Sequence, residues 1–139
     1  MMLWSNSDSS GNYAVALSSS DNGKLTGNWK HGFKPLYRKG RYFPNNGGHP
    51  MLFTDLNGRL MMSIHSPNSW SAENPTAAVF YEIQDTDNTL KIAAIEQTRA
   101  QTSSWQLFLD DTKENFNDLI SIIKIASEKF SNSVETLFK

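Results

Sequence analysis

Short apolar runs alternate with polar turn residues over roughly the first 95 residues of the chain. The clearest runs, which are rich in aromatic and β-branched residues, cover residues 13–19, 50–55, 59–66 and 77–84. Gly, Asn, Asp and Ser lie between them, a pattern typical of strands that end in turns. The pair Asn57-Gly58 separates the second and third runs and suits a tight hairpin with positive φ. We therefore expect antiparallel strands, with a firmly set register in this hairpin.

One pattern occurs twice in this part of the chain. Residues 3–19 and 52–66 each start with Leu and an aromatic residue, pass through a turn containing Gly, and end in a seven-residue strand that finishes in Ser. The offset is 49 residues at the first Leu and 47 at the last Ser. A repeat of about 40 to 50 residues with several strands per unit has the size of a propeller blade. Two similar hairpins in a β-sandwich are the alternative.

The apolar spacing changes to that of a helix after Asp110. Apolar residues then recur at intervals of three and four, at Phe116, Leu119, Ile120, Ile123, Ala126, Phe130, Val134 and Leu137. This is the stripe of an amphipathic helix, and Asp111 followed by Glu114 has the arrangement of a capping box. The sequence predicts a helix over residues 112–138. It therefore divides into a β part (1–95), a linker or last strand (96–110) and a C-terminal helical segment (111–139).

Composition narrows the class of protein. The 139 residues suit one domain, and 38% hydrophobic and 12% aromatic residues are enough for a packed core. A net charge of −1 without a basic run argues against a nucleic-acid partner. The absence of cysteine excludes disulfides, thiolate metal sites and cysteine nucleophiles. We find no signal-peptide pattern and no apolar run of about 18 residues, so we expect no membrane partner and, if the chain is complete, a cytoplasmic location.

His49 is the first candidate for a functional residue. It follows Gly47 and Gly48 and precedes Pro50, and paired glycines allow another chain or a ligand to approach the backbone closely. At the start of a blade's innermost strand its ring would face the central channel. The alternative is a structural histidine bonded to backbone carbonyls. We expect His65, at the end of a strand, to cap backbone groups.

The remaining candidates give no complete catalytic arrangement. His31 has no neighbour at metal-ligand spacing and is expected at the surface. Glu82 lies within the predicted strand 77–84 and is the one acid expected to point into an ordered face; a half-exposed strand glutamate is the alternative. The other acids of this part stand among turn residues and are expected to form turns: Asp8, Asp21, Asp55, Glu73, Asp85 and Asp87. We therefore assign no catalytic residue, since acid–base chemistry needs carboxyls that converge on one pocket.

Several motifs nevertheless match one enzyme family in order. They are "LWS" at 3–5, "YAVALSSS" at 13–20, Gly-Asn-Trp at 27–29, Gly-Gly-His-Pro-Met at 47–51, "DLNGRLMMSIHSPN" at 55–68 and an aromatic closing strand. Together they resemble the C-terminal portion of glycoside hydrolase family 43, which comprises five-bladed β-propeller enzymes such as arabinanases, arabinofuranosidases and β-xylosidases. The resemblance covers residues 2 to about 92. It implies a mainly β fold of about two four-stranded antiparallel propeller blades, followed by the long helix.

The resemblance also implies roles for particular residues. In such enzymes the corresponding histidine projects into the central channel, where some members hold calcium. His49, with Gly48 beside it, would then line the channel or contact substrate, and His49 would be a metal ligand. Calcium prefers oxygen, so water would have to complete the shell. Pro50 departs from the family pattern, which has Gly after the histidine, and fixes φ at that position.

The catalytic acids of the family come from blades that precede "LWS", so the resemblance leaves this chain without them. We expect a fragment or subunit of a family 43-like hydrolase for arabinose- or xylose-containing polysaccharide that is not catalytic alone. Two blades cannot close a ring, so a missing N-terminal propeller part or further copies of the chain would cover the open faces. The alternative is a non-catalytic carbohydrate-binding or oligomeric assembly module. Its candidate sugar-stacking residues are Trp4, Trp29, Tyr42, Trp70 and Tyr81.

Overall fold

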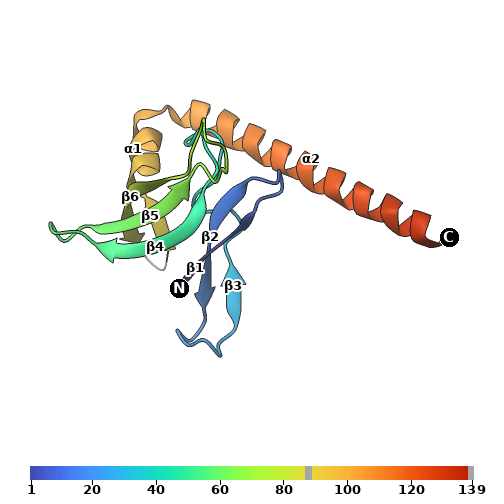
Figure 1. Ribbon diagram of the computed structural model, residues 1–139. Helices are drawn as coiled ribbons and strands as arrows, with labels where there is room; N and C mark the ends of the chain where they lie inside the picture. The colour runs from blue at the N-terminus through green and yellow to red at the C-terminus, as the bar shows by residue number, and fades with distance from the viewer. Residues whose placement is uncertain (87–88, 138–139) are drawn as a thin grey trace. The chain divides into compact units, whose positions relative to one another are not determined.

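The computed structural model describes residues 1–86 and 89–137 of the chain. These residues contain seven strands and two helices, joined by turns and loops (Figure 1). The chain divides into two units, which we call the sheet unit (Met1–Ala100) and the helix unit (Gln101–Lys139). All seven strands belong to the sheet unit. Among the described residues, no helix is both long and apolar enough to cross a membrane.

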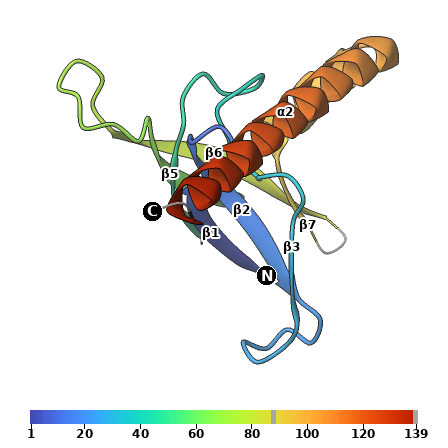
Figure 2. The same cartoon turned by 90° about the vertical axis from the view of Figure 1, so that its right-hand side faces the viewer.

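The first sheet has three antiparallel strands in the order β1 (Met2–Ser7), β2 (Tyr13–Ser20) and β3 (Trp29–His31). β1 and β2 lie side by side in both views (Figure 1 and Figure 2). Tyr37 forms an isolated bridge to Val15 through two backbone hydrogen bonds of 2.9 and 3.2 Å. The sheet therefore has three strands and a bridge where four strands were expected.

The second sheet is a four-stranded antiparallel meander. Its order is β4 (Gly48–Thr54), β5 (Leu60–Ser66), β6 (Ala77–Thr86) and β7 (Thr89–Ile92). The β4–β5 turn is the predicted hairpin: Gly58 has a φ of 79°, and the Asp55 N–H donates to the Arg59 carbonyl over 3.0 Å. The predicted strands and the hairpin are thus confirmed.

The core of the sheet unit lies between the two sheets. The second sheet contributes alternate residues of its inner face, such as Met62, Ile64 and Ile83, and the first contributes Val15 with the bridging Tyr37. Each fully buried aliphatic side chain stabilises the fold by about 1.5–3 kcal/mol. The mainly β part and the C-terminal helix are as expected. Two antiparallel sheets across one core suit both adjacent blades and a sandwich, so the blade architecture stays a prediction.

Residues 96–110 do not form a last strand. Among the described residues the last strand is β7, and it is followed by α1 (Ala93–Gln101) and by α2 (Ser104–Leu137). The Ala, Glu, Gln and Arg residues of α1 favour a helix. Only Ala93 of α1 is buried, so the sequence has no apolar stripe here from which the helix could be predicted.

α2 begins eight residues earlier than predicted. Ser103 caps it: the Gln106 N–H donates to Ser103 Oγ over 3.3 Å, and the Leu107 N–H donates to the Ser103 carbonyl over 3.0 Å. The Asp111 capping box is therefore not the start of the helix. The predicted helix end at residue 138, the last position of the 111–139 segment and the turn former Asp87 lie outside the described residues.

Candidate functional site

The two glycines before His49 are needed where β4 approaches β2. The Gly47 N–H donates to the Tyr13 carbonyl over 3.0 Å. A Cβ on Gly47 would lie 2.7 Å from the His65 carbonyl, and a Cβ on Gly48 would clash with the ring of Tyr13. Both glycines are buried. The close approach inferred from the sequence is therefore an approach of the chain's own strands.

His49 itself lies exposed at this junction of the two sheets. Its φ is 53°, a left-handed conformation that is uncommon for a residue with a side chain. Its backbone N–H donates to Ser5 Oγ on β1 over 3.0 Å. Its ring lies 5.4 Å from the ring of Tyr13 and 5.3 Å from that of His65, centroid to centroid. The structure thus brings together two histidines that the sequence treated separately.

The donor set around His49 does not fit an all-protein calcium site. Calcium takes six to eight oxygen ligands, whereas His49 and His65 offer nitrogen. Among the described residues no group of three or more His, Cys, Asp or Glu side chains is close enough to hold a metal ion. Calcium at His49 stays a prediction and requires water for most of its shell.

A hydrogen-bonded cluster of Trp4, Ser18 and His31 lies on the outer face of the first sheet. The Trp4 indole N–H donates to Ser18 Oγ over 2.8 Å, and Ser18 Oγ lies 2.7 Å from His31 Nδ1. Ser18 is 1% exposed, and an indole N–H only donates. The hydroxyl therefore accepts the indole N–H of Trp4. Its second hydrogen bond joins it to His31 Nδ1, and the tautomer of His31 decides which of these two atoms donates.

A pocket with a volume of about 330 Å³ lies beside this cluster. Trp4, His31 and Phe33 give it aromatic walls, and Asn6 and Asp8 add polar groups. Asp8 Oδ1 accepts the backbone N–H groups of Ser10 and Asn12 at 2.9 Å each, as expected for a turn former. Flat aromatic walls with a few polar groups are suited to a small polar ligand that also has apolar faces.

The Trp4–Ser18–His31 cluster was not predictable from the sequence pattern. Its members come from β1, β2 and β3, and only the strand pairing, with Ser18 opposite His31 and Trp4 opposite Ala16, brings them together. The expectation that His31 lies at the surface is correct for its exposure. That expectation did not include the hydrogen bond between His31 and the buried Ser18.

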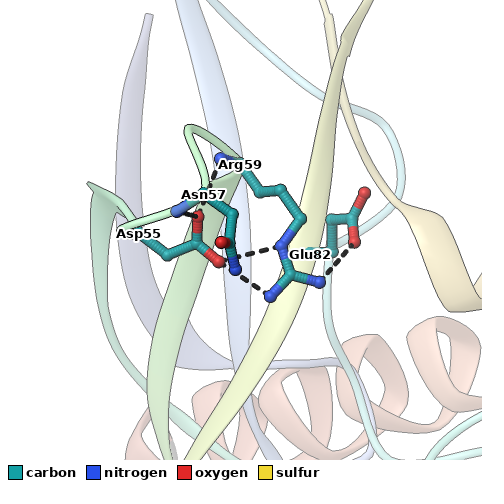
Figure 3. Close-up of polar contacts among 4 residues, drawn as sticks. All are labelled: Asp55, Asn57, Arg59 and Glu82. Carbon is teal, nitrogen blue, oxygen red and sulfur yellow. Dashed lines mark hydrogen bonds and ion pairs between the residues drawn. The ribbon is translucent and has the colours of Figure 1, made fainter.

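Glu82 belongs to a surface ion-pair cluster at the β4–β5 hairpin (Figure 3). Arg59 lies 2.7 Å from Asp55 Oδ2 and 3.5 Å from Glu82 Oε2. The Arg59 backbone N–H, and then its side chain, hold the pKa of Asp55 below the usual carboxyl value. Asp55 Oδ1 also accepts the Asn57 N–H over 2.9 Å. These contacts fix the turn and leave the carboxylates of Asp55 and Glu82 paired with a cation.

The five candidate stacking aromatics differ in their surroundings. Tyr42 and Tyr81 pack against the core, and burial raises the pKa of Tyr81. Trp29 is half-buried and donates its indole N–H to the Leu25 carbonyl over 3.0 Å. Trp70 is fully exposed. Of the five, Trp4 alone lines the described pocket beside the Trp4–Ser18–His31 cluster.

The chain was compared with protein-family models, curated proteins and solved structures, and none of the three comparisons gives a match.

Proposed function

We propose that the sheet unit is a partial propeller of the family 43 glycoside hydrolase type, which binds arabinose- or xylose-containing carbohydrate and does not hydrolyse it alone. One observation carries this proposal: four large apolar side chains lie on the outer face of the second sheet, opposite the core. Met51 and Phe80 are exposed there, and Phe53 and Met61 are half-buried, with Ser63 and Glu82 on the same face. Phe53 and Phe80 meet edge to face at 6.0 Å.

An outer face of this kind supports an incomplete architecture. Each blade of a propeller packs between two neighbours, so a blade at an open end exposes apolar side chains that a closed ring would bury. A self-contained sandwich favours polar residues at these positions, because its outer faces meet water. Met51 and Phe80, which flank Ser63 in one cross-strand row, are both exposed.

The placement of the carboxylates supports a role without hydrolysis. Inverting glycosidases need two carboxyls about 6.5–9.5 Å apart across a sugar, and retaining ones about 5–5.5 Å apart. In this chain Asp8 bonds its own turn, and Asp55 and Glu82 share Arg59. None of these three is free to act on a glycosidic bond.

The pocket beside Trp4 supports the alternative, a carbohydrate-binding module, as a second candidate. An indole and a phenyl ring can stack on the apolar faces of a pentose, and Asn6 with His31 Nε2 offers hydrogen bonds to its hydroxyls. The two candidates are compatible, since the partial propeller would present this pocket.

A hydrolysis assay tests the claim that the chain does not act alone. We expect the purified chain to release no aryl alcohol from an aryl arabinofuranoside or an aryl xyloside. Turnover that disappears in Glu82→Gln would show that the chain has its own acid and would overturn this part of the proposal. Circular dichroism of the variant checks that its fold is retained.

A further inference from the structure

We propose that α2 pairs with α2 of a second copy of the chain as an antiparallel two-stranded coiled coil. The proposal rests on residues of the helix unit alone. It is therefore independent of the proposed function, and either can fail without the other.

A seam with a strict seven-residue repeat runs along α2. Leu109, Phe116, Ile123 and Phe130 follow one another at intervals of seven, and each is between 43% and 73% exposed. A second line lies three residues after or four residues before each of them, at Trp105, Thr112, Leu119 and Ala126. Alternating intervals of three and four define the a and d positions of a coiled coil.

The side of α2 opposite this seam is mainly polar. Glu114, Ser121 and Glu128 follow one another at the same interval of seven, at the heptad position farthest from the seam, and Leu107 is the apolar residue at that position. An apolar seam and a polar back are the pattern of a helix that pairs along one side.

The length and area of α2 suffice for a stable pair. Its 34 residues span about 50 Å at about 1.5 Å per residue. Trp105, Phe116 and Phe130 each offer about 150–250 Å² when fully buried. With the aliphatic seam residues, two copies bring on the order of 1,000 Å² of apolar surface, the size that a specific interface needs.

The sizes of the seam residues favour the antiparallel orientation. Parallel helices pack a against a and d against d, which would stack Phe116 on Phe116 and leave Ala126 opposite Ala126. Antiparallel helices centred on Ser121 place Phe116 opposite Ala126 of the second copy and Phe130 opposite Thr112. These layers each combine a large and a small side chain, and the central layers pair Leu119 with Ile123, so no layer stacks two phenylalanines or two alanines.

The residues that flank the seam favour the same orientation. Ile120 and Ile122 are exposed on either side of the centre. In the antiparallel pair Ile120 lies beside Ile120 of the second copy, and Ile122 lies beside Ile122 of the second copy. Each pair of apolar side chains is thereby shielded from water. The parallel pair would place Ile120 beside Asn115 and Ile122 beside Ser127.

The charge of α2 disfavours an anionic membrane surface as the occupant. Residues 104–137 contain six acidic residues and three lysines. Helices that lie on membranes are commonly rich in Lys and Arg on the polar face, because lipid headgroups are often anionic. A second copy of the same seam has no such requirement.

Light scattering of the full chain tests the pairing. We expect a mass of twice 15.7 kDa for the native sequence and 15.7 kDa for Ile123→Asp, which places a charge in the seam. Ser121→Asp is the matched control, since it adds the same charge on the polar side and should keep the doubled mass. A native chain with a mass of 15.7 kDa, a larger assembly, or binding of that single chain to lipid vesicles would overturn the proposal. Circular dichroism checks that both variants keep their helix.

Crosslinking tests the orientation, because the chain has no cysteine of its own. Thr112→Cys and Phe130→Cys should form a disulfide dimer when the two proteins are mixed under oxidising conditions, and neither should do so alone. Self-crosslinking of Thr112→Cys would show parallel helices and contradict the antiparallel pair.

Discussion

The hydroxyl of Ser18 lies 2.7 Å from His31 Nδ1, across the pairing of β2 with β3. The same oxygen accepts the indole N–H of Trp4 from β1. One buried hydroxyl thus ties together three strands and orients the two rings of the pocket. Hydrogen bonds of buried groups matter most when one partner is removed, because the others lose their bonds without regaining water.

Removal of this hydroxyl should destabilise the sheet unit. We expect Ser18→Ala to lower the free energy of unfolding by about 1–3 kcal/mol, since the Trp4 indole N–H loses its acceptor. Urea denaturation followed by tryptophan fluorescence measures the change. Ser19→Ala on the other face of β2 is the control and should change stability little. Equal losses in the two variants would show that the Ser18 hydroxyl has no special part in the fold.

A methyl group at Gly48 should also be costly. The added Cβ of Gly48→Ala would meet the Tyr13 ring, and such overpacking costs about 1–3 kcal/mol. The control is Gly11→Ala, where a Cβ has open space and only the positive φ of 78° opposes it. We expect the double variant Gly48→Ala/Tyr13→Ala to lose less than the sum of its single changes. Strict additivity would contradict a contact between the two positions.

Asp55 should make the stability of the hairpin depend on pH. Its pKa in the folded state lies below the ordinary value of 3.8, chiefly because the Arg59 backbone N–H donates to it. A lowered folded-state pKa adds stability above the unfolded-state pKa, and this stability is lost as the pH falls through the folded-state pKa. Native protein and Asp55→Asn should therefore differ in urea midpoint at pH 7 and converge below about pH 4. A difference that stays constant down to pH 2 would contradict this role.

The two faces of the second sheet should respond differently to substitution. Ile64 is buried in the core, and Ile64→Ala should cost about 2–5 kcal/mol. Phe80 is exposed on the outer face, so Phe80→Ser should change stability by much less and reduce the fluorescence of a bound hydrophobic dye. Unfolding curves and dye titrations measure both effects. A large loss of stability in Phe80→Ser would mean that this face is already covered within the chain.

The local elements of the sheet unit were largely predictable from the sequence. Alternation marks β2, β4, β5 and β6, and Asn57-Gly58 marks the hairpin, because each signal lies within a few residues. α1 was not predictable from periodicity, since it has no apolar face, and Ser103 displaced Asp111 as the cap of α2. The bridge at Tyr37, which stands in place of a fourth strand in the first sheet, was not predictable either. A single paired residue leaves no periodic signal in the sequence.

The candidate sites were less predictable than the strands. Gly47 and Gly48 indicated a close approach, but which segment approaches depends on the packing of β2 against β4. His49 and His65 become neighbours through the pairing of Gly48 with His65. The Trp4–Ser18–His31 cluster likewise requires the registers of two strand pairs. Contacts between distant segments follow from register and packing, which a pattern of single residues does not specify.

The proposed function holds that the sheet unit binds pentose-containing carbohydrate, and the pocket beside Trp4 is the candidate binding site for it. An NMR titration of the tryptophan indole N–H signals tests this claim most directly. Addition of arabino- or xylo-oligosaccharide should shift the Trp4 signal in a saturable way and leave the exposed Trp70 signal in place. An unchanged Trp4 signal at millimolar oligosaccharide, or a shift of Trp70 alone, would contradict the account.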